Sequence, residues 1–301
     1  QDGTHKDTLV TSLKATGAEI NTGTEDAKIV TPKAIADSTL VFTNSLAYQC
    51  IINGGFTVNQ RGYVSNATLA AGVYGHDRWK AGAGGGDYTF TQLAQATTIT
   101  IKTGKSLIQV IEDKNVIGGT YTLSWTGTAQ ARFGIDSATP SGDYAASPIT
   151  ITTQTAGTVM SVEFNAGTLG KVVLANSSVA LPFMPKSYEE ELRACQRYYE
   201  KNNINGSPYN EAVISLAQNE AILIANISYR VPKRGTPVVT IYDCESTPVA
   251  NKVSTSGLQD AIAVTSITTG DSGGISRLVF SGTPLTAGTY YWYNWVASAE
   301  L

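Results

Sequence analysis

The chain has 301 residues, a hydrophobic content of 42%, only 15% charged residues and a formal net charge of −3. This length allows two domains, and the hydrophobic content is sufficient for folded cores. The sequence has no basic tract of the kind by which proteins bind nucleic acid. No apolar run is long enough for membrane insertion.

Cysteine and histidine usage narrows the chemistry further. Cys50, Cys195 and Cys244 are far apart and form no CxxC pair, which indicates reduced, buried thiols. His5 and His76 are the only histidines, so a zinc site with paired imidazoles is disfavoured. A Ser-His-Asp triad would have only His76 as a plausible base. We expect no cofactor and no metal site.

The first predicted unit is residues 1–49, which lack the apolar density of a core. Thr31 can cap a short helix that has Pro32 at its first position. A flexible linker is one interpretation of this segment. The other is a stalk, in which several copies wind together with apolar side chains turned inward. Those side chains would be Ile29, Val30 and Ile35.

Residues 50–185 consist of short, β-branched runs separated by turn residues at a spacing of roughly ten, which predicts an antiparallel sandwich or jelly roll. In "TYTLSWT", Tyr121, Leu123 and Trp125 share one strand face, so Trp125 is expected in the core. The glycine-dense "GAGGGDY", residues 82–88, lacks a phosphate-binding pattern and is predicted to be a flexible loop.

A connector helix is predicted over residues 186–203. Ser187 and Glu190 form a capping box at its start, and an apolar stripe recurs at helical spacing. The stripe consists of Tyr188, Leu192, Cys195 and Tyr199. This pattern predicts a rigid helix between two β-domains.

Residues 204–301 return to strands and end in an aromatic cluster. Alternation places Tyr291, Tyr293 and Trp295 on one side of the last strand, and Tyr290 and Trp292 on the other. We expect one side to face the core, and the other to be free for a neighbouring subunit or a sugar.

Several motifs occur in a fixed order along the chain. They are "TGTEDAKIVTPKAIADS", "IINGGFTVNQRGY", "HDRWKAG", "LPFMPKSYEEELRACQRYYEK", "VPKRGTPVV" and "WVASAEL". Together they resemble the receptor-binding region of bacteriophage tail fibres and tailspikes. One departure is "VVLANSSVALPF", where relatives often carry a Gln-Leu-Glu-x-Gly stretch. We interpret it as variation in the last sandwich strand.

The resemblance implies a mainly β fold in four parts: a fibre-stalk segment, a carbohydrate-binding-like jelly-roll β-sandwich, a connecting α-helix and a C-terminal β-sandwich domain. It also implies a homotrimer at the virion tail, made in the host cytoplasm and joined to other tail proteins through the N-terminal segment. The motif residues would then be structural. They are Asn53, Phe56, Arg61, Asp77, Trp79, Cys195, Arg197, Tyr198 and Tyr199.

The leading hypothesis is a receptor-binding adhesin that recognises bacterial surface polysaccharide, either lipopolysaccharide or capsule, without cleaving it. Exposed aromatic rings suit sugar faces, and polar side chains suit sugar hydroxyls. The candidate contacts lie at turns or on the less clearly buried strand face. They are Tyr209, Tyr242, Asp243, Tyr290 and Trp292.

Two alternatives remain open. A depolymerase would need two carboxylates about 5 to 9.5 Å apart, for which Glu112 with Asp113 and Asp243 with Glu245 are the candidates. Adjacent acids on one strand point to opposite faces, which disfavours the first pair. The other alternative is a structural trimerisation module at the end of a fibre. A cation at "DCE", residues 243–245, has too few ligands to be expected.

Overall fold

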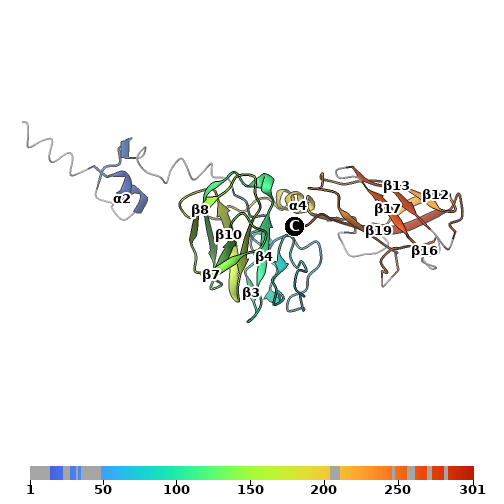
Figure 1. The fold of residues 1–301 in the computed structure, drawn as a ribbon, viewed down its shortest axis with the longest axis horizontal. Coiled ribbons are helices and arrows are strands. Elements are labelled where there is room, and N and C mark those ends of the chain that lie inside the picture. Colours follow the sequence, from blue (N-terminus) through green and yellow to red (C-terminus); the bar gives the residue numbers. More distant parts are fainter. Residues whose placement is uncertain are drawn as a thin grey trace, which may run out of the picture.

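In the computed structural model the chain is mainly β, as predicted. The structure describes residues 14–22, 28–31, 33–34, 49–203, 211–245, 248–255, 262–269, 273–280 and 284–301. Figure 1 shows the parts in chain order: a short N-terminal segment, a β-sandwich, a helix and a second β-domain. No helix in these ranges is long and apolar enough to span a membrane.

The N-terminal segment contains the helix α2, Gly17–Thr22, which the sequence analysis did not anticipate. A reciprocal pair opens it, because Thr16 Oγ1 accepts from the Glu19 N–H at 3.3 Å and Glu19 Oε2 accepts from the Thr16 N–H at 2.8 Å. A parallel bridge joins Lys14 to Ile29.

The predicted cap at Thr31 is present, since its Oγ1 accepts from the Ala34 N–H at 3.2 Å. In this single chain Ile29 and Val30 are 64% and 53% exposed. Both side chains are thus exposed in one chain, and their packing between several wound copies of the segment stays a prediction. Pro32 and Ile35 lie outside the described residues.

The sandwich consists of two antiparallel five-stranded sheets. The first has the order β1 (Lys80–Ala81), β4 (Leu107–Ile111), β9 (Met160–Phe164), β6 (Ala131–Gly134) and β7 (Ser141–Ala145). The second has the order β2 (Tyr88–Phe90), β3 (Ile99–Ile101), β10 (Gly167–Ala175), β5 (Gly119–Thr126) and β8 (Ile149–Gln154). A 3-10 turn, Asp113–Asn115, follows β4.

One core fills the space between these sheets. The alternation predicted for β5 is confirmed, because Tyr121, Leu123 and Trp125 are buried in that core. Phe164 of the facing sheet meets Trp125 edge-on, with ring centroids 5.1 Å apart. Such an aromatic contact stabilises the sandwich beyond the area that it buries.

The glycine-dense segment is not a loose loop, which corrects the prediction. A Cβ atom at Gly82 would lie 2.0 Å from Ser106 Oγ, and one at Gly86 would lie 2.7 Å from the Cβ atom of Ala81. The glycines are therefore needed because the backbone packs directly against neighbouring strands.

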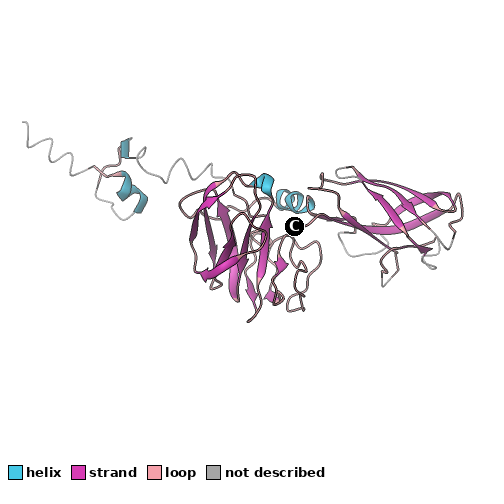
Figure 2. Cartoon of the chain, in the orientation of Figure 1, coloured by secondary structure: helices cyan, strands magenta, loops and turns pink. Residues whose placement is uncertain are grey.

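The connector helix is shorter than predicted. Helix α4 covers Tyr188–Gln196, and its capping box is confirmed: Ser187 Oγ accepts from the Glu190 N–H, and Glu190 accepts from the Ser187 N–H. The next residues form strand β11, Tyr199–Lys201. Tyr199 therefore does not continue the helical stripe. Figure 2 shows α4 between the two strand-rich bodies.

The C-terminal domain is built on one seven-stranded antiparallel sheet. Its order is β11, β19 (Tyr290–Ser298), β12 (Val213–Asn219), β13 (Ile222–Ser228), β18 (Gly274–Val279) and β17 (Ser266–Thr269), and β14 (Val238–Tyr242) pairs with β19. A two-stranded ribbon joins β15 (Lys252–Val253) and β16 (Ile262–Ala263). Tyr291, Tyr293 and Trp295 of β19 are buried in its core, as the alternation predicted.

Candidate functional site

The motif residues converge where the sandwich meets α4 and the last residues of the chain. Arg61 contacts two tyrosine rings, with its guanidinium carbon 3.6 Å from the Tyr199 centroid and 4.9 Å from that of Tyr74. Its Nη2 donates to Glu300 Oε1 at 2.9 Å. Segments far apart in sequence are therefore joined by cation–π and ionic contacts.

Arg78 forms the second half of this junction. Its guanidinium carbon lies 3.6 Å from the Tyr198 ring centroid, and its Nη1 donates to Glu300 Oε2. Its Nη2 donates to the Val110 carbonyl at 2.6 Å. Arg78 is 2% exposed, so Glu300 neutralises a charge that would be costly to bury alone.

Asp77 is fully buried beside Arg61, with its Oδ1 3.6 Å from Arg61 Nη1. Gln60 donates to its carboxylate from both the backbone and the side chain. Burial raises the pKa of Asp77 to about 6, and the Arg61 charge opposes that rise. The Arg61–Asp77 pair suggested by the sequence is present, but the Arg61 charge lowers the pKa of Asp77 by less than burial raises it.

A polar network organises the sandwich side of the junction around Asn53. Its Nδ2 donates to the Val58 and Asp77 carbonyls, and its Oδ1 accepts from the Thr57 and Val58 N–H groups. Trp79 Nε1 donates to the Asn53 carbonyl at 3.0 Å. These contacts give Asn53 and Trp79 a scaffolding role.

Phe56 completes the packing beneath that network. Its ring stacks on Trp79 with centroids 5.0 Å apart, and both side chains are fully buried. Cys195 of α4 is also buried, and burial raises the pKa of its thiol well above the ordinary value. Its location favours packing over thiol chemistry.

Helix α4 is tied to the sandwich at both ends. Glu191 Oε1 accepts from the Asn53 N–H at 2.5 Å. Beyond the helix, Arg197 donates twice to Glu112, and Tyr198 donates to the same carboxylate at 2.7 Å. Burial would raise the pKa of Glu112, but these hydrogen bonds hold it below its ordinary value.

The candidate sugar contacts lie elsewhere, mainly on the outer face of the C-terminal sheet. Tyr290 is 55% exposed, whereas Trp292 and Tyr242 are half-buried on the same face. Asp243 does not fit, because its side chain is fully buried and its Oδ1 accepts from the Val249 N–H at 2.8 Å. Tyr209 lies outside the described residues.

Aliphatic side chains missed by sequence reasoning surround Tyr290 and Trp292. In the β12–β19 register, Leu216 lies opposite Tyr290 and Ile214 lies opposite Trp292. Ile214 and Leu216 are 56% and 45% exposed. Their alternation with buried residues of β12 could have revealed this face, but only pairing with β19 brings the four side chains together.

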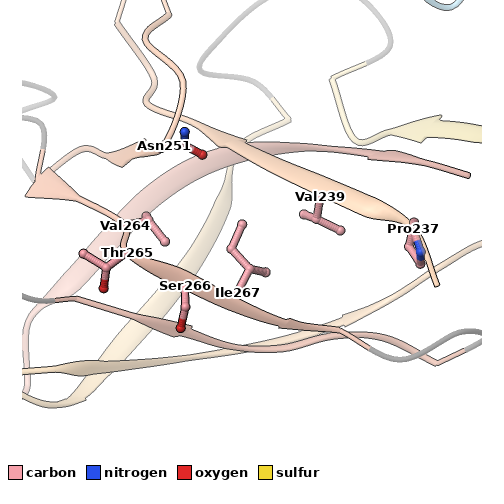
Figure 3. A pocket seen from close by; sticks show the side chains of 7 residues that line it. All are labelled: Pro237, Val239, Asn251, Val264, Thr265, Ser266 and Ile267. Atoms are coloured by element: carbon pink, nitrogen blue, oxygen red, sulfur yellow. The ribbon is translucent and has the colours of Figure 1, made fainter.

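A hollow of about 330 Å³ lies on another side of this domain, between β14 and the segment that leads into β17. Figure 3 shows that Val239 and Pro237 extend along one wall, while Val264, Thr265, Ser266 and Ile267 line the other. Asn251 closes one end, since its N–H donates to the Ile241 carbonyl and its carbonyl accepts from the Val264 N–H. None of the lining residues is titratable, so this hollow suits binding and not acid–base chemistry.

Three of the four carboxylates considered for a depolymerase make structural contacts. Glu112 is 3% exposed and bound to Arg197 and Tyr198, while Asp113, the first residue of the 3-10 turn, accepts from the Lys114 N–H. In the other pair the buried Asp243 anchors a turn. Glu112 and Asp243 are thus buried and held by hydrogen bonds, unlike a carboxylate that lies open to a sugar. Within the described ranges, no cluster of three or more His, Cys, Asp or Glu residues could hold a metal ion.

Comparisons with known proteins add little to this picture. No family model matches the chain, and no curated protein matches it. Among solved structures, wild-type discoidin II from Dictyostelium discoideum is similar, with 11% sequence identity and a TM-score of 0.20. That comparison covers 87% of this chain and 97% of the other. A TM-score this low carries no argument about fold or ligand.

Proposed function

We propose that the chain is the receptor-binding part of a phage tail fibre, which recognises bacterial surface polysaccharide without cleaving it. The ligand would be lipopolysaccharide or capsule. The protein would act as a homotrimer in the virion tail, attached to other tail proteins through its N-terminal segment. The ordered motifs support this proposal, and their residues meet in one buried junction.

The observation that carries the sugar-binding part is Tyr290, which presents a half-exposed ring from β19. This strand pairs with β11, β12 and β14, so the ring sits on a fixed backbone. A pre-positioned aromatic ring loses little freedom on binding, and its polar tip can bond a sugar hydroxyl. Three copies would raise the effective concentration of a weak, shallow site.

A glycan array of bacterial polysaccharides tests the proposal directly. Tyr290→Ala should weaken binding of the recognised glycan about tenfold, the usual order of loss for an aromatic contact. Tyr188→Ala is the matched control, because Tyr188 is 50% exposed on α4 and its loss should leave binding unchanged. Unchanged binding by Tyr290→Ala, or no glycan binding by the wild type, contradicts the proposed site. Release of reducing ends from the bound glycan contradicts the absence of cleavage.

The aliphatic neighbours of Tyr290 favour a second candidate function, a trimerisation clamp in which this sheet face meets another subunit. Exposed Ile214 and Leu216 suit a protein interface better than a sugar. The double variant Ile214→Ser, Leu216→Ser separates the candidates when mass in solution and glycan affinity are both measured. Loss of the trimer with retained affinity per chain favours the clamp, whereas loss of affinity in an intact trimer favours the sugar site.

A further inference from the structure

A second hollow, of about 330 Å³, lies on the sandwich, far in sequence from Tyr290. It is lined by Gly104, Lys105, Ser106, Tyr144, Asn165 and Ala166. Tyr144 comes from β7, whereas Lys105 precedes β4 and Asn165 follows β9. Sheet pairing brings these positions together, and its volume is at the lower end of the range for small-molecule sites.

An ion pair between the partly exposed Arg132 and the buried Glu163 holds the aromatic wall of this hollow. The Arg132 guanidinium carbon lies 4.7 Å from the Tyr144 ring centroid, and Arg132 Nε donates to Glu163 Oε2 at 2.8 Å. Glu163 is 4% exposed, and its other oxygen accepts from Ser106 Oγ at 2.6 Å. Arg132 therefore occupies one face of the Tyr144 ring and fixes its position.

Hydrogen-bond donors dominate the polar groups that remain for a ligand. Lys105 Nζ donates to the Gly84 carbonyl at 2.9 Å, which leaves two of its three hydrogens available. Asn165 Oδ1 accepts from the Gln130 N–H at 2.8 Å, so the amide NH₂ is its remaining group. Burial and the charge of Glu163 raise the pKa of Tyr144, which keeps its hydroxyl protonated.

Two acids lie near these donors: Asp87, which interacts with the charge of Lys105, and Glu163. Glu163 is neutralised by Arg132 and satisfied by Ser106, so it offers little to a ligand. Lys105, Asn165 and Tyr144 thus line one small space. A carboxylate accepts from such donors strongly, and a pyranose ring can lie against the free side of Tyr144.

We propose that this hollow binds an acidic sugar, a hexuronic acid residue of a polysaccharide, with its carboxylate on Lys105 and Asn165 and its ring against Tyr144. The inference rests on the proposed function only in taking a polysaccharide as the ligand, because the site is separate from Tyr290. Specificity for a charged over a neutral sugar would come from the partly buried ammonium of Lys105.

Isothermal titration calorimetry of the full chain with oligogalacturonate, and with its methyl ester, tests the proposal. The ester keeps the sugar ring but removes the charge, so it should bind about tenfold more weakly. Lys105→Gln should weaken oligogalacturonate binding by a similar factor and should abolish the preference for the acid over the ester. Lys114→Gln, an exposed lysine on the 3-10 turn, is the matched control and should change neither value.

Tyr144→Ala should also weaken binding, with folding checked by circular dichroism. Tyr290→Ala should leave oligogalacturonate binding intact, which distinguishes this site from the proposed function. No binding of oligogalacturonate, equal binding of acid and ester, or wild-type affinity in Lys105→Gln would overturn the proposal. Loss of oligogalacturonate binding in Tyr290→Ala would place the ligand on the C-terminal sheet instead.

Discussion

At the scale of single residues, His76 and Asp77 are adjacent in sequence and buried, and their pKa values are displaced in opposite senses. Burial lowers the pKa of His76 to about 4, and burial raises the pKa of Asp77 to about 6. The His76 ring bonds to the Tyr88 hydroxyl and to the Gln92 side chain, so its neutral form is built into the core.

These displacements give opposite dependences of stability on pH. Folded Asp77 keeps its proton up to about pH 6, whereas unfolded Asp77 loses it near 3.8, so its stabilising contribution falls as pH rises through that window. Unfolded His76 gains a proton below about 6.5, whereas folded His76 gains one only near pH 4. The contribution of His76 therefore falls as pH drops.

Asp77→Asn removes the opposing pH dependence of Asp77, so the pH dependence of stability that His76 causes should become measurable. The free energy of unfolding of this variant should fall as pH drops from 6.5 to 4, by up to about 3 kcal/mol, while the wild type changes less. Urea denaturation at several pH values measures the slope. His76→Gln is the complementary variant and should give a slope of the opposite sign. Parallel pH profiles for Asp77→Asn and the wild type would refute this account.

At the scale of elements, local patterns identify the start of α4 and the core faces of strands better than they identify the structure of loops. The α4 capping box involves residues three apart, and the β5 core face involves every second residue, so both follow from local geometry. The structure of the glycine-dense segment before β2 is instead set by contacts with residues outside the segment. Its glycines are required by backbone packed against Ser106 and Ala81.

Gly82→Ala should therefore destabilise the sandwich, because the new methyl group would collide with Ser106 Oγ and approach Glu163 Oε1 at 2.7 Å. We expect a loss of about 1–3 kcal/mol, the usual cost of overpacking. Gly235→Ala is the control, since a Cβ atom there meets nothing within 4 Å. Thermal unfolding should show a lowered midpoint only for Gly82→Ala. Equal midpoints for the two variants would contradict tight packing of this segment.

At the scale of the whole molecule, the two β-domains are coupled by charge buried at their junction. Glu300 binds both Arg61 and Arg78, and the chain beyond α4 adds further contacts. The Ala299 N–H donates to the Tyr198 carbonyl at 2.7 Å, and the Tyr74 hydroxyl donates to the Leu301 carbonyl at 2.6 Å. Such contacts make the relative placement of the domains part of the folded state.

Glu300→Ala should uncouple the domains, because it leaves two guanidinium groups at the junction without their shared carboxylate. Breaking a buried ion pair in this way typically costs about 3–5 kcal/mol. Differential scanning calorimetry should show one transition for the wild type and two for Glu300→Ala. Glu220→Ala, at an exposed turn, should keep the single transition. A single transition at the wild-type temperature in Glu300→Ala would show that the domains are held by other contacts.

The amino-acid sequence by itself determined the mainly β fold, the start of α4, the Thr31 cap and the inward face of the last strand, because each depends on neighbours within a few residues. Tertiary structure alone decided that α4 ends at Gln196, since Tyr199–Lys201 instead pairs with β19. It also buried Asp243 and placed Lys105, Tyr144 and Asn165 around one hollow. These arrangements join segments that are distant along the chain, and sheet pairing that closes such long loops has no signature in any local pattern.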